Sequence, residues 1–140
     1  MKARVRWLED RNFVAESGSG HALVLGASKA ESPALGASPM ELVLIGLGGC
    51  SAIDVVLILE KGRAAVSGCV VELEAERAAT EPKVFTKIHL RFTVTGSGLS
   101  RAKVERAVEL SAEKYCSVSA MLDKTATITH EVEILDRPIP

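Results

Sequence analysis

The stretch Ser38–Gly62 reads SPMELVLIGLGGCSAIDVVLILEKG, and it decides how the rest of the chain folds. Ser38 can cap a helix, and Pro39 suits the first helical position. Glu41 stands three residues after the cap and completes a capping box. An almost unbroken apolar run follows, so the sequence predicts one helix over 39–61, with a length on the order of 33 Å.

This predicted helix is apolar nearly all round, and such a helix must be buried on most sides. The protein has 140 residues, which leaves little other chain to cover the helix. We therefore expect a second copy of the chain to cover it in a homodimer. The alternative is a membrane span, but the apolar run 42–59 is marginal in length and carries Asp54 near its centre. We expect no membrane span.

Length and composition indicate a single domain over residues 1–140. Hydrophobic residues make up 47% of the chain, which is enough for a proper core. The formal net charge is -1, without the basic excess typical of a nucleic-acid-binding protein. The first residues are charged and show no apolar signal core. We therefore expect a cytoplasmic protein whose cysteines stay reduced.

The remaining patterns predict strands on both sides of the central helix. The order β-β-β-α-β-β-α-β is not a strict alternation, so the fold class is α+β, with a mainly antiparallel sheet and a long buried central helix. The predicted elements besides that helix are a strand around Val5 and Trp7, a hairpin of 12–15 and 21–25, strands 69–77 and 84–95, a helix capped by Ser100, a helical turn 118–122 and a strand 125–134.

The side chains of these elements sort into faces. An antiparallel pairing of strands 69–77 and 84–95 sets an acidic row against a basic one, which is a favourable ladder. The acidic row is Glu72, Glu74 and Glu76, and the basic row is Lys87, His89 and Arg91. The opposite face of the second strand is predicted to consist of Val84, Thr86, Ile88, Leu90, Phe92 and Val94. The inner face of the second helix is predicted to consist of Val104, Ala107, Val108, Ser111 and Tyr115.

Three cysteines carry the chemical interest of the chain: Cys50, Cys69 and Cys116. No CxxC and no Cys/His pair with zinc spacing is present, so we expect no metal. Cys69 belongs to an apolar strand face and is expected to be inert. Cys50 lies halfway along the central helix after two glycines, where a lone cysteine is usually a small core residue. Cys116 is expected at a helix N-terminus, which favours thiolate, so the two thiols could form an attacking and a resolving pair.

Two motifs resemble the OsmC/Ohr family, and in particular its YhfA-like branch. They are Ser38-Pro39-Met40-Glu41-Leu42 leading to Gly48-Gly49-Cys50, and Glu113-Lys114-Tyr115-Cys116-Ser117-Val118-Ser119-Ala120-Met121-Leu122. The resemblance covers nearly the whole chain. It implies an intertwined homodimer that reduces organic hydroperoxides, without metal, haem or flavin.

By this resemblance Cys50 is the peroxidatic residue and Cys116 the resolving one. Attack by a Cys50 thiolate gives a sulfenic acid, which then condenses with Cys116 to a disulfide. An external dithiol, lipoyl-linked in this family, reopens the disulfide by exchange.

The sequence also departs from the family pattern. The family carries a glutamate ten residues before the first cysteine, bonded to an arginine that stabilises the thiolate, and Met40 stands at that position. Glu41, one residue on, is interpreted as a helix cap in preference to a catalytic group, and with Asp54 it is a candidate for a supporting role beside Cys50. Arg6 and Arg11 are the candidates for the arginine. Asp54 shares the Cys50 helix face and has two interpretations: it orients an Arg or Lys that serves Cys50, or it caps or pairs structurally within the dimer core.

These departures keep two other functions open. One is a non-catalytic dimeric module that binds an apolar ligand and only retains the cysteines. The other is a redox sensor whose disulfide alters a contact with a partner.

Overall fold

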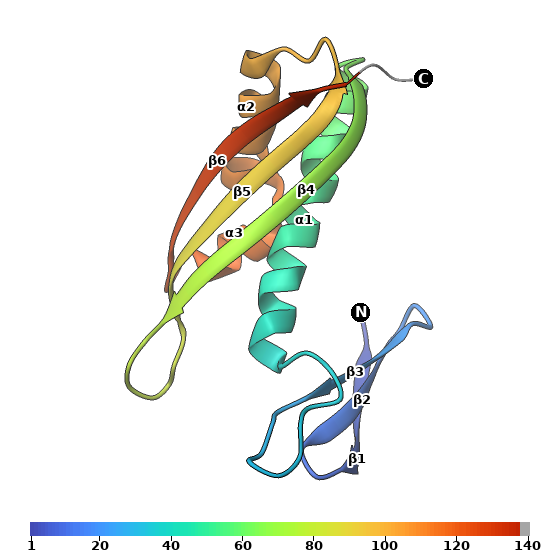
Figure 1. The fold of residues 1–140 in the computed structure, drawn as a ribbon, viewed down its shortest axis with the longest axis vertical. Coiled ribbons are helices and arrows are strands. Elements are labelled where there is room, and N and C mark those ends of the chain that lie inside the picture. The colour runs from blue at the N-terminus through green and yellow to red at the C-terminus, as the bar shows by residue number, and fades with distance from the viewer. Residues whose placement is uncertain (138–140) are drawn as a thin grey trace. The chain divides into compact units, whose positions relative to one another are not determined.

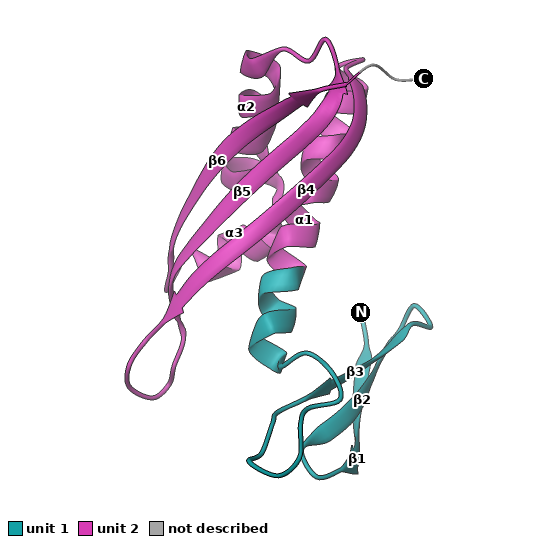
Figure 2. Cartoon of the chain, viewed as in Figure 1, with its two compact units in different colours: residues 1–45 teal, residues 46–140 magenta. Residues whose placement is uncertain are grey.

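The computed structural model describes residues 1–137, which form two compact units. The first unit is Met1–Ile45 and the second begins at Gly46 (Figure 2). Helix α1, Pro39–Lys61, starts in the first unit and continues in the second (Figure 1). The expectation of a single domain over residues 1–140 stays a prediction.

The first unit is an antiparallel meander of three short strands. They are β1 (Ala3–Glu9), β2 (Asn12–Ser17) and β3 (Ala22–Gly26), which confirms the predicted hairpin. Asn12 is the buried polar residue of this sheet, and its Oδ1 accepts a hydrogen bond of 2.9 Å from the Leu35 amide. This bond ties the loop after β3 to the sheet.

Helix α1 begins with the predicted capping box. The Glu41 amide donates to Ser38 Oγ over 3.3 Å, and the Ser38 amide donates to Glu41 Oε2 over 2.7 Å. Hydrogen bonding to the side chain and backbone of Ser38 lowers the pKa of the Glu41 carboxyl. The interpretation of Glu41 as a helix cap agrees with this geometry, and the helix ends at Lys61 as predicted.

The second unit contains a sheet in the order β4-β5-β6. Strands β4 (Ala65–Arg77) and β5 (Phe85–Ser97) are antiparallel, and the predicted charge ladder is confirmed. Its rungs are Glu72 opposite Arg91, Glu74 opposite His89, and Glu76 opposite Lys87. These side chains are exposed, so their ion pairs contribute little to the free energy of unfolding. The ladder mainly helps to set the register of the two strands.

One end of this pairing differs from the prediction. Val84 lies outside β5, and Phe85 is the buried side chain there. The reason is a register shift between Glu76 and Arg77, because Arg77 pairs with Phe85 and not with Thr86, its partner on a regular ladder. Further along β5 the buried residues are those predicted: Ile88, Leu90, Phe92 and Val94.

Strand β6 (Thr127–Asp136) pairs with β5 in parallel, so this sheet is mixed and only mainly antiparallel. Parallel strands need a crossover between them. Here the crossover consists of α2 (Arg101–Leu110), the π-helical turn η1 (Ser111–Tyr115) and α3 (Ser117–Leu122). Ser100 stands at the N-cap of α2 as predicted, but its side chain makes no capping hydrogen bond.

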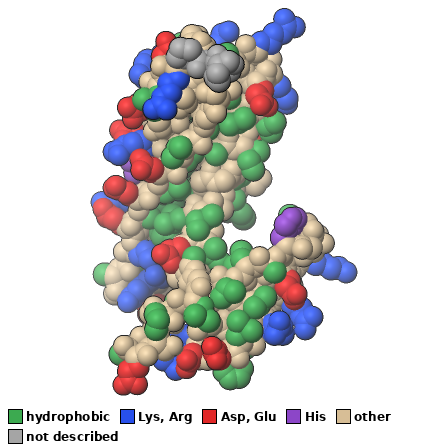
Figure 3. All heavy atoms as spheres, turned by 45° about the vertical axis from the view of Figure 1, so that its right-hand side comes forward, with side chains coloured by type: hydrophobic (Ala, Val, Ile, Leu, Met, Phe, Trp, Pro, Cys, Tyr) green, Lys and Arg blue, Asp and Glu red, His purple; other side chains and the backbone are tan. Residues whose placement is uncertain are grey.

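Burial of α1 by a second copy stays a prediction, and the single chain does not cover most sides of the helix, as expected from the short length of the chain. Its buried residues form one stripe, consisting of Leu47, Gly48, Ser51, Val55 and Leu59. Gly48 lets the helix lie close to β4, since a Cβ there would come within 2.8 Å of Leu73 Cδ1. On the other side, Ile45, Ile53 and Leu57 are 60%, 62% and 47% exposed. Hydrophobic side chains are therefore present at the molecular surface, as Figure 3 shows.

By length and composition alone, α1 is apolar enough to cross a membrane, with 28% of its apolar window buried within the chain. The core helix of a folded domain passes the same test. The stripe that packs on β4 and the polar Asp54 in the middle of the helix favour the second interpretation.

Replacing Ser38 with alanine removes the side chain that caps α1. We expect the free energy of unfolding to fall by about 1 kcal/mol, the usual cost of losing such a cap. Denaturation followed by circular dichroism measures this loss. Ser67→Ala, at an exposed serine of β4, is the matched control and leaves the stability nearly unchanged. A Ser38→Ala protein as stable as the wild type contradicts the capping role.

Candidate functional site

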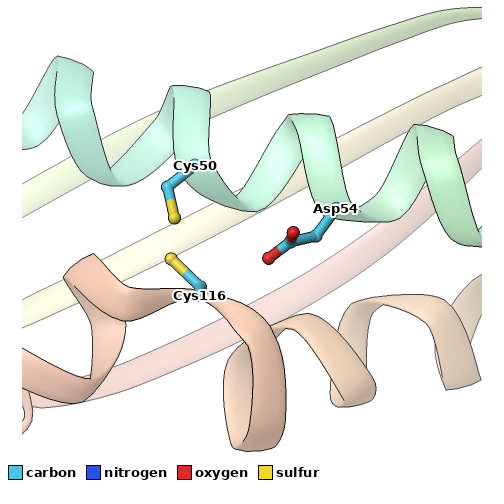
Figure 4. A group of neighbouring side chains, drawn as sticks. All are labelled: Cys50, Asp54 and Cys116. Carbon is cyan, nitrogen blue, oxygen red and sulfur yellow. The ribbon is translucent and has the colours of Figure 1, made fainter.

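Two of the three cysteines meet in the second unit. The sulfurs of Cys50 and Cys116 and a carboxylate oxygen of Asp54 all lie within 4.8 Å of one another. Cys50 and Asp54 extend from successive turns of α1, and Cys116 reaches them from the start of α3 (Figure 4). The two sulfurs point toward each other, and the carboxylate points into the same space. The structure therefore brings together Cys50, Asp54 and Cys116, three of the residues that the sequence singled out as candidates.

The position of Cys116 depends on the irregular turn before it. The Cys116 amide donates to the Ser111 carbonyl over 2.9 Å, across the π-helical turn η1. This wide turn ends α2, and Cys116 becomes the N-cap of α3, as its predicted place at a helix N-terminus requires. Its Sγ accepts a hydrogen bond of 3.4 Å from the Ser119 amide. Single π turns of this kind are frequent at functional sites.

Ser51 is a site residue that was not predicted from the sequence. It is 3% exposed, and its Oγ donates to Cys116 Sγ over 3.5 Å. A signal for it was present, because a hydroxyl on an apolar helix face must find a partner when it is buried. The sequence does not say which partner, since 65 positions separate the two residues.

Asp54 is held by a second residue whose role was not predicted, Ser111. The Ser111 Oγ donates to Asp54 Oδ2 over 3.1 Å, and Ser111 is 1% exposed. Ser111 was predicted on the inner face of its helix, and there its hydroxyl serves the site. Within residues 1–137, Asp54 forms no ion pair with Lys or Arg, and both interpretations of Asp54 stay predictions.

The two thiols differ in how their charge is stabilised. Burial raises the pKa of the Cys116 thiol, but hydrogen bonds outweigh burial and bring this pKa below the ordinary cysteine value. The donors are Cys50, Ser119 and Ser51. Burial raises the pKa of Cys50, and so do its hydrogen bond to Cys116 and the nearby negative charge of Asp54. The first thiolate of the pair therefore belongs to Cys116.

The other candidates are not members of this cluster or differ from expectation. Cys69 is half-buried in β4, and burial raises its pKa, as expected of an inert thiol. Tyr115 was predicted in the core but is 50% exposed, because the π turn rotates it out of the helical register. Arg6 and Arg11 belong to the first unit, and their role as partners of the site stays a prediction.

A small cavity adjoins the cluster beside Asp54, with a volume of about 300 Å³. Its walls are mainly apolar, with Leu57 and Ile58 from α1 and Leu110 and Tyr115 from the facing segment. An apolar cavity next to polar, reactive groups is the usual form of a small-molecule site.

A titration of thiolate ultraviolet absorbance tests the order of ionisation. We expect the reduced protein to lose one thiol proton below the ordinary cysteine pKa and two above it, because the pKa is lowered for Cys116 and raised for Cys50 and Cys69. Cys116→Ser removes the step at low pH. The control Cys69→Ser removes a step at high pH only. A low-pH step that persists in Cys116→Ser contradicts this order.

Comparisons with known proteins cover nearly the whole chain. The family model described as OsmC-like protein matches residues 30–131. The chain is 53% identical over 136 residues to protein YhfA of Escherichia coli strain K12, covering 96% of this chain and 98% of YhfA.

Solved structures extend the comparison to the fold. A hypothetical protein from Aquifex aeolicus VF5 is 29% identical with a TM-score of 0.80, over 96% of this chain and 97% of that one. The organic hydroperoxide resistance protein OsmC from Legionella pneumophila is 18% identical with a TM-score of 0.70, over 94% and 95% of the two chains, and shares the fold. The matching family model and the 53% identity to YhfA show that the chain belongs to the OsmC-like protein family.

Proposed function

We propose that this protein is a thiol-dependent peroxidase that reduces organic hydroperoxides through Cys50 and Cys116. The observation that carries the proposal is the pair of facing sulfurs within 4.8 Å of each other. Two reduced thiols at this distance can give two electrons to a peroxide and be oxidised to a disulfide. The Legionella pneumophila relative is named for resistance to organic hydroperoxides, which makes this substrate class the first to test.

Cys50 is the residue that attacks in this proposal. It is half-buried, whereas Cys116 is 2% exposed, so a peroxide in the site meets the Cys50 sulfur first. The Cys116 thiolate accepts the hydrogen bond of the Cys50 thiol and can take its proton as the attack begins. The low pKa of Cys116 thus supports a role as proton acceptor and later as resolving nucleophile.

The steps balance in atoms and electrons. The Cys50 sulfur attacks the outer peroxide oxygen, the O–O bond breaks, and the alkoxide takes the proton held by Cys116 and leaves as an alcohol. Cys50 is now a sulfenic acid. The Cys116 thiolate attacks that sulfur and expels hydroxide, which leaves a disulfide between the two cysteines. The peroxide has gained two electrons, and the thiol pair has lost them.

The cavity beside Asp54 supports an organic substrate over hydrogen peroxide. Its apolar walls from Leu57, Ile58 and Leu110 suit the alkyl or aryl part of a hydroperoxide. A volume of about 300 Å³ is at the lower end of ordinary ligand pockets. The cavity therefore has room for the organic part of a small hydroperoxide.

An external dithiol must reopen the disulfide for the cycle to continue. Exchange runs through a mixed disulfide on one of the two cysteines, and the half-buried Cys50 is the more accessible one. We propose a lipoyl-linked dithiol as this reductant, as the family resemblance implies. The cycle suits the cytoplasm, where reduced thiols are maintained.

We also propose the intertwined homodimer. The exposed face of α1 carries Ile53 and Leu57, and a Cβ added at Gly46 or Gly49 would meet no neighbour within 4 Å. Small and apolar residues on one helix face allow two helices to pack closely. The exposed Trp7 and Val5 of the first unit are further apolar surface that a second copy can cover.

A non-catalytic ligand-binding module is the second candidate. Met40 replaces the family glutamate, and within residues 1–137 no Lys or Arg pairs with Asp54 or with the thiols. The apolar cavity is the observation that favours this function. A protein that binds an apolar ligand at the cavity without consuming peroxide selects it over the peroxidase. A disulfide that forms slowly and changes a partner contact selects the redox sensor.

Thiol titration before and after peroxide tests the peroxidase. We expect one equivalent of cumene hydroperoxide to remove two of the three free thiols and to leave Cys69. Cys50→Ser abolishes this loss. Cys116→Ser instead accumulates a sulfenic acid on Cys50, which dimedone traps for mass spectrometry. Cys69→Ser is the matched control and reacts as the wild type does. Unchanged thiols in the wild type contradict the proposal.

A charge on the free face of α1 tests the dimer. Ile53→Glu places a carboxylate where we expect a second helix to pack, and burial of an unpaired charge is costly. We expect light scattering to show a dimer for the wild type and a monomer for Ile53→Glu. Val70→Glu is the control, since Val70 of β4 is 59% exposed, against 62% for Ile53. A wild-type monomer, or an Ile53→Glu dimer, contradicts this interface.

A further inference from the structure

The cluster of Cys50, Asp54 and Cys116 has a chemical use that peroxide reduction does not employ. Two sulfurs and a carboxylate oxygen converge within 4.8 Å from two segments of the chain. These are ligand atoms that transition metals prefer, and the site is half-buried to buried. We propose that the reduced protein binds one zinc ion through Cys50, Cys116 and Asp54.

The spacing of the three atoms suits zinc. Zinc bonds are about 2.3 Å long to thiolate and about 2.0–2.2 Å to carboxylate, so two ligand atoms of one tetrahedral ion lie about 3.5–3.8 Å apart. The three side chains start from mutual distances of at most 4.8 Å. Small rotations within the site therefore close it around the ion, without movement of α1 or α3.

The charges of the cluster also call for a cation. When a metal displaces the thiol protons, two thiolates and one carboxylate carry three negative charges in a space from which water is partly excluded. Within residues 1–137, no ion pair with Lys or Arg neutralises Asp54, whose hydrogen-bond partner is Ser111. A divalent cation at this point removes the repulsion that otherwise opposes ionisation of both sulfurs.

Neighbouring hydrogen bonds hold the ligands in place. Ser111 donates to Asp54 over 3.1 Å, and Ser51 and the Ser119 amide donate to Cys116 over 3.5 and 3.4 Å. Partners of this kind orient metal ligands and are a regular part of zinc sites. Three protein ligands leave a fourth position open, so the bound ion keeps a water or an exchangeable group.

The sequence pattern showed no sign of such a site, and no metal was predicted. Zinc motifs are recognised by close spacing, such as CxxC, and here 66 positions separate the two cysteines along the chain, Cys50 and Cys116. The soft thiolates select zinc over magnesium or calcium. Binding does not depend on the proposed peroxidase activity, but the two compete for the same sulfurs, because a disulfide removes two of the three ligands.

Equilibrium dialysis of the reduced full-length protein against zinc alone tests the proposal. We expect one zinc per chain for the wild type and for Cys69→Ser, which keeps the cluster and removes the remaining free thiol. Cys50→Ser, Cys116→Ser and Asp54→Asn each weaken zinc binding at least tenfold. Circular dichroism confirms that each variant is folded. Peroxide-oxidised wild type, its thiol loss verified by titration, binds no zinc.

Cobalt supplies a second readout, which reports directly on thiolate ligands. Cobalt(II) bound by two thiolates gives sulfur-to-cobalt charge-transfer absorption, which we expect for wild type and for Cys69→Ser. Absence of zinc binding in the reduced wild type overturns the proposal, as does binding that is unchanged in Cys50→Ser and Cys116→Ser, or a cobalt complex without this absorption. No peroxide enters the binding measurements on reduced protein, so failure here and failure of the peroxidase are separate results.

Discussion

Hydrogen bonds to the Cys116 sulfur are the interaction on which the site depends. Ser51 of α1 and the Ser119 amide of α3 both donate to this sulfur, so one atom links two helices of the second unit. The π turn before α3 makes the link possible, since its amide-to-carbonyl bond from Cys116 to Ser111 sets the direction in which the chain enters α3. With a regular helical turn the sulfur would face elsewhere.

Placement of this sulfur also sets the electrostatics of the pair. Donors to Cys116 favour its thiolate, and that negative charge together with Asp54 keeps the Cys50 proton in place. Cys50 therefore keeps its proton while Cys116 carries the first negative charge of the pair. A peroxide that withdraws electrons from the pair and a cation that neutralises both sulfurs act on the same arrangement. The same cluster therefore supports both proposals. Peroxide reduction and zinc binding cannot occur at the same moment, because a disulfide removes two of the three zinc ligands.

Helix α1 contributes residues both to the site and to the exposed apolar surface. One stripe of α1 packs on β4 and holds Ser51 toward Cys116, while the opposite stripe exposes Ile53 and Leu57. Hydrophobic association is non-directional, so an uncovered apolar stripe of this kind is a cost that a second copy relieves. Burial of the helix on most sides, expected from its composition, is therefore a property of the proposed dimer and not of the chain alone.

Much of this protein could be predicted from local sequence. The capping box at Ser38, the helix that ends at Lys61 and the charge ladder between β4 and β5 follow from patterns within a few residues, because helix caps and strand faces depend on neighbours along the chain. Family resemblance added Cys50 and Cys116 as candidates. The parallel pairing of β6, the exposed Tyr115 and the shift at Phe85 were not predicted, since each depends on how a turn or crossover places one segment beside another.

By itself the sequence determined the elements, their order and the three free cysteines. Only the tertiary structure decided that the Cys50 and Cys116 sulfurs and the Asp54 carboxylate converge within 4.8 Å, and which serines hold Cys116 and Asp54. The physical reason is the distance along the chain over which each interaction acts. Helix and strand patterns arise from interactions between residues a few positions apart, whereas the hydrogen bond from Ser51 to Cys116 spans 65 positions, and no local pattern encodes it.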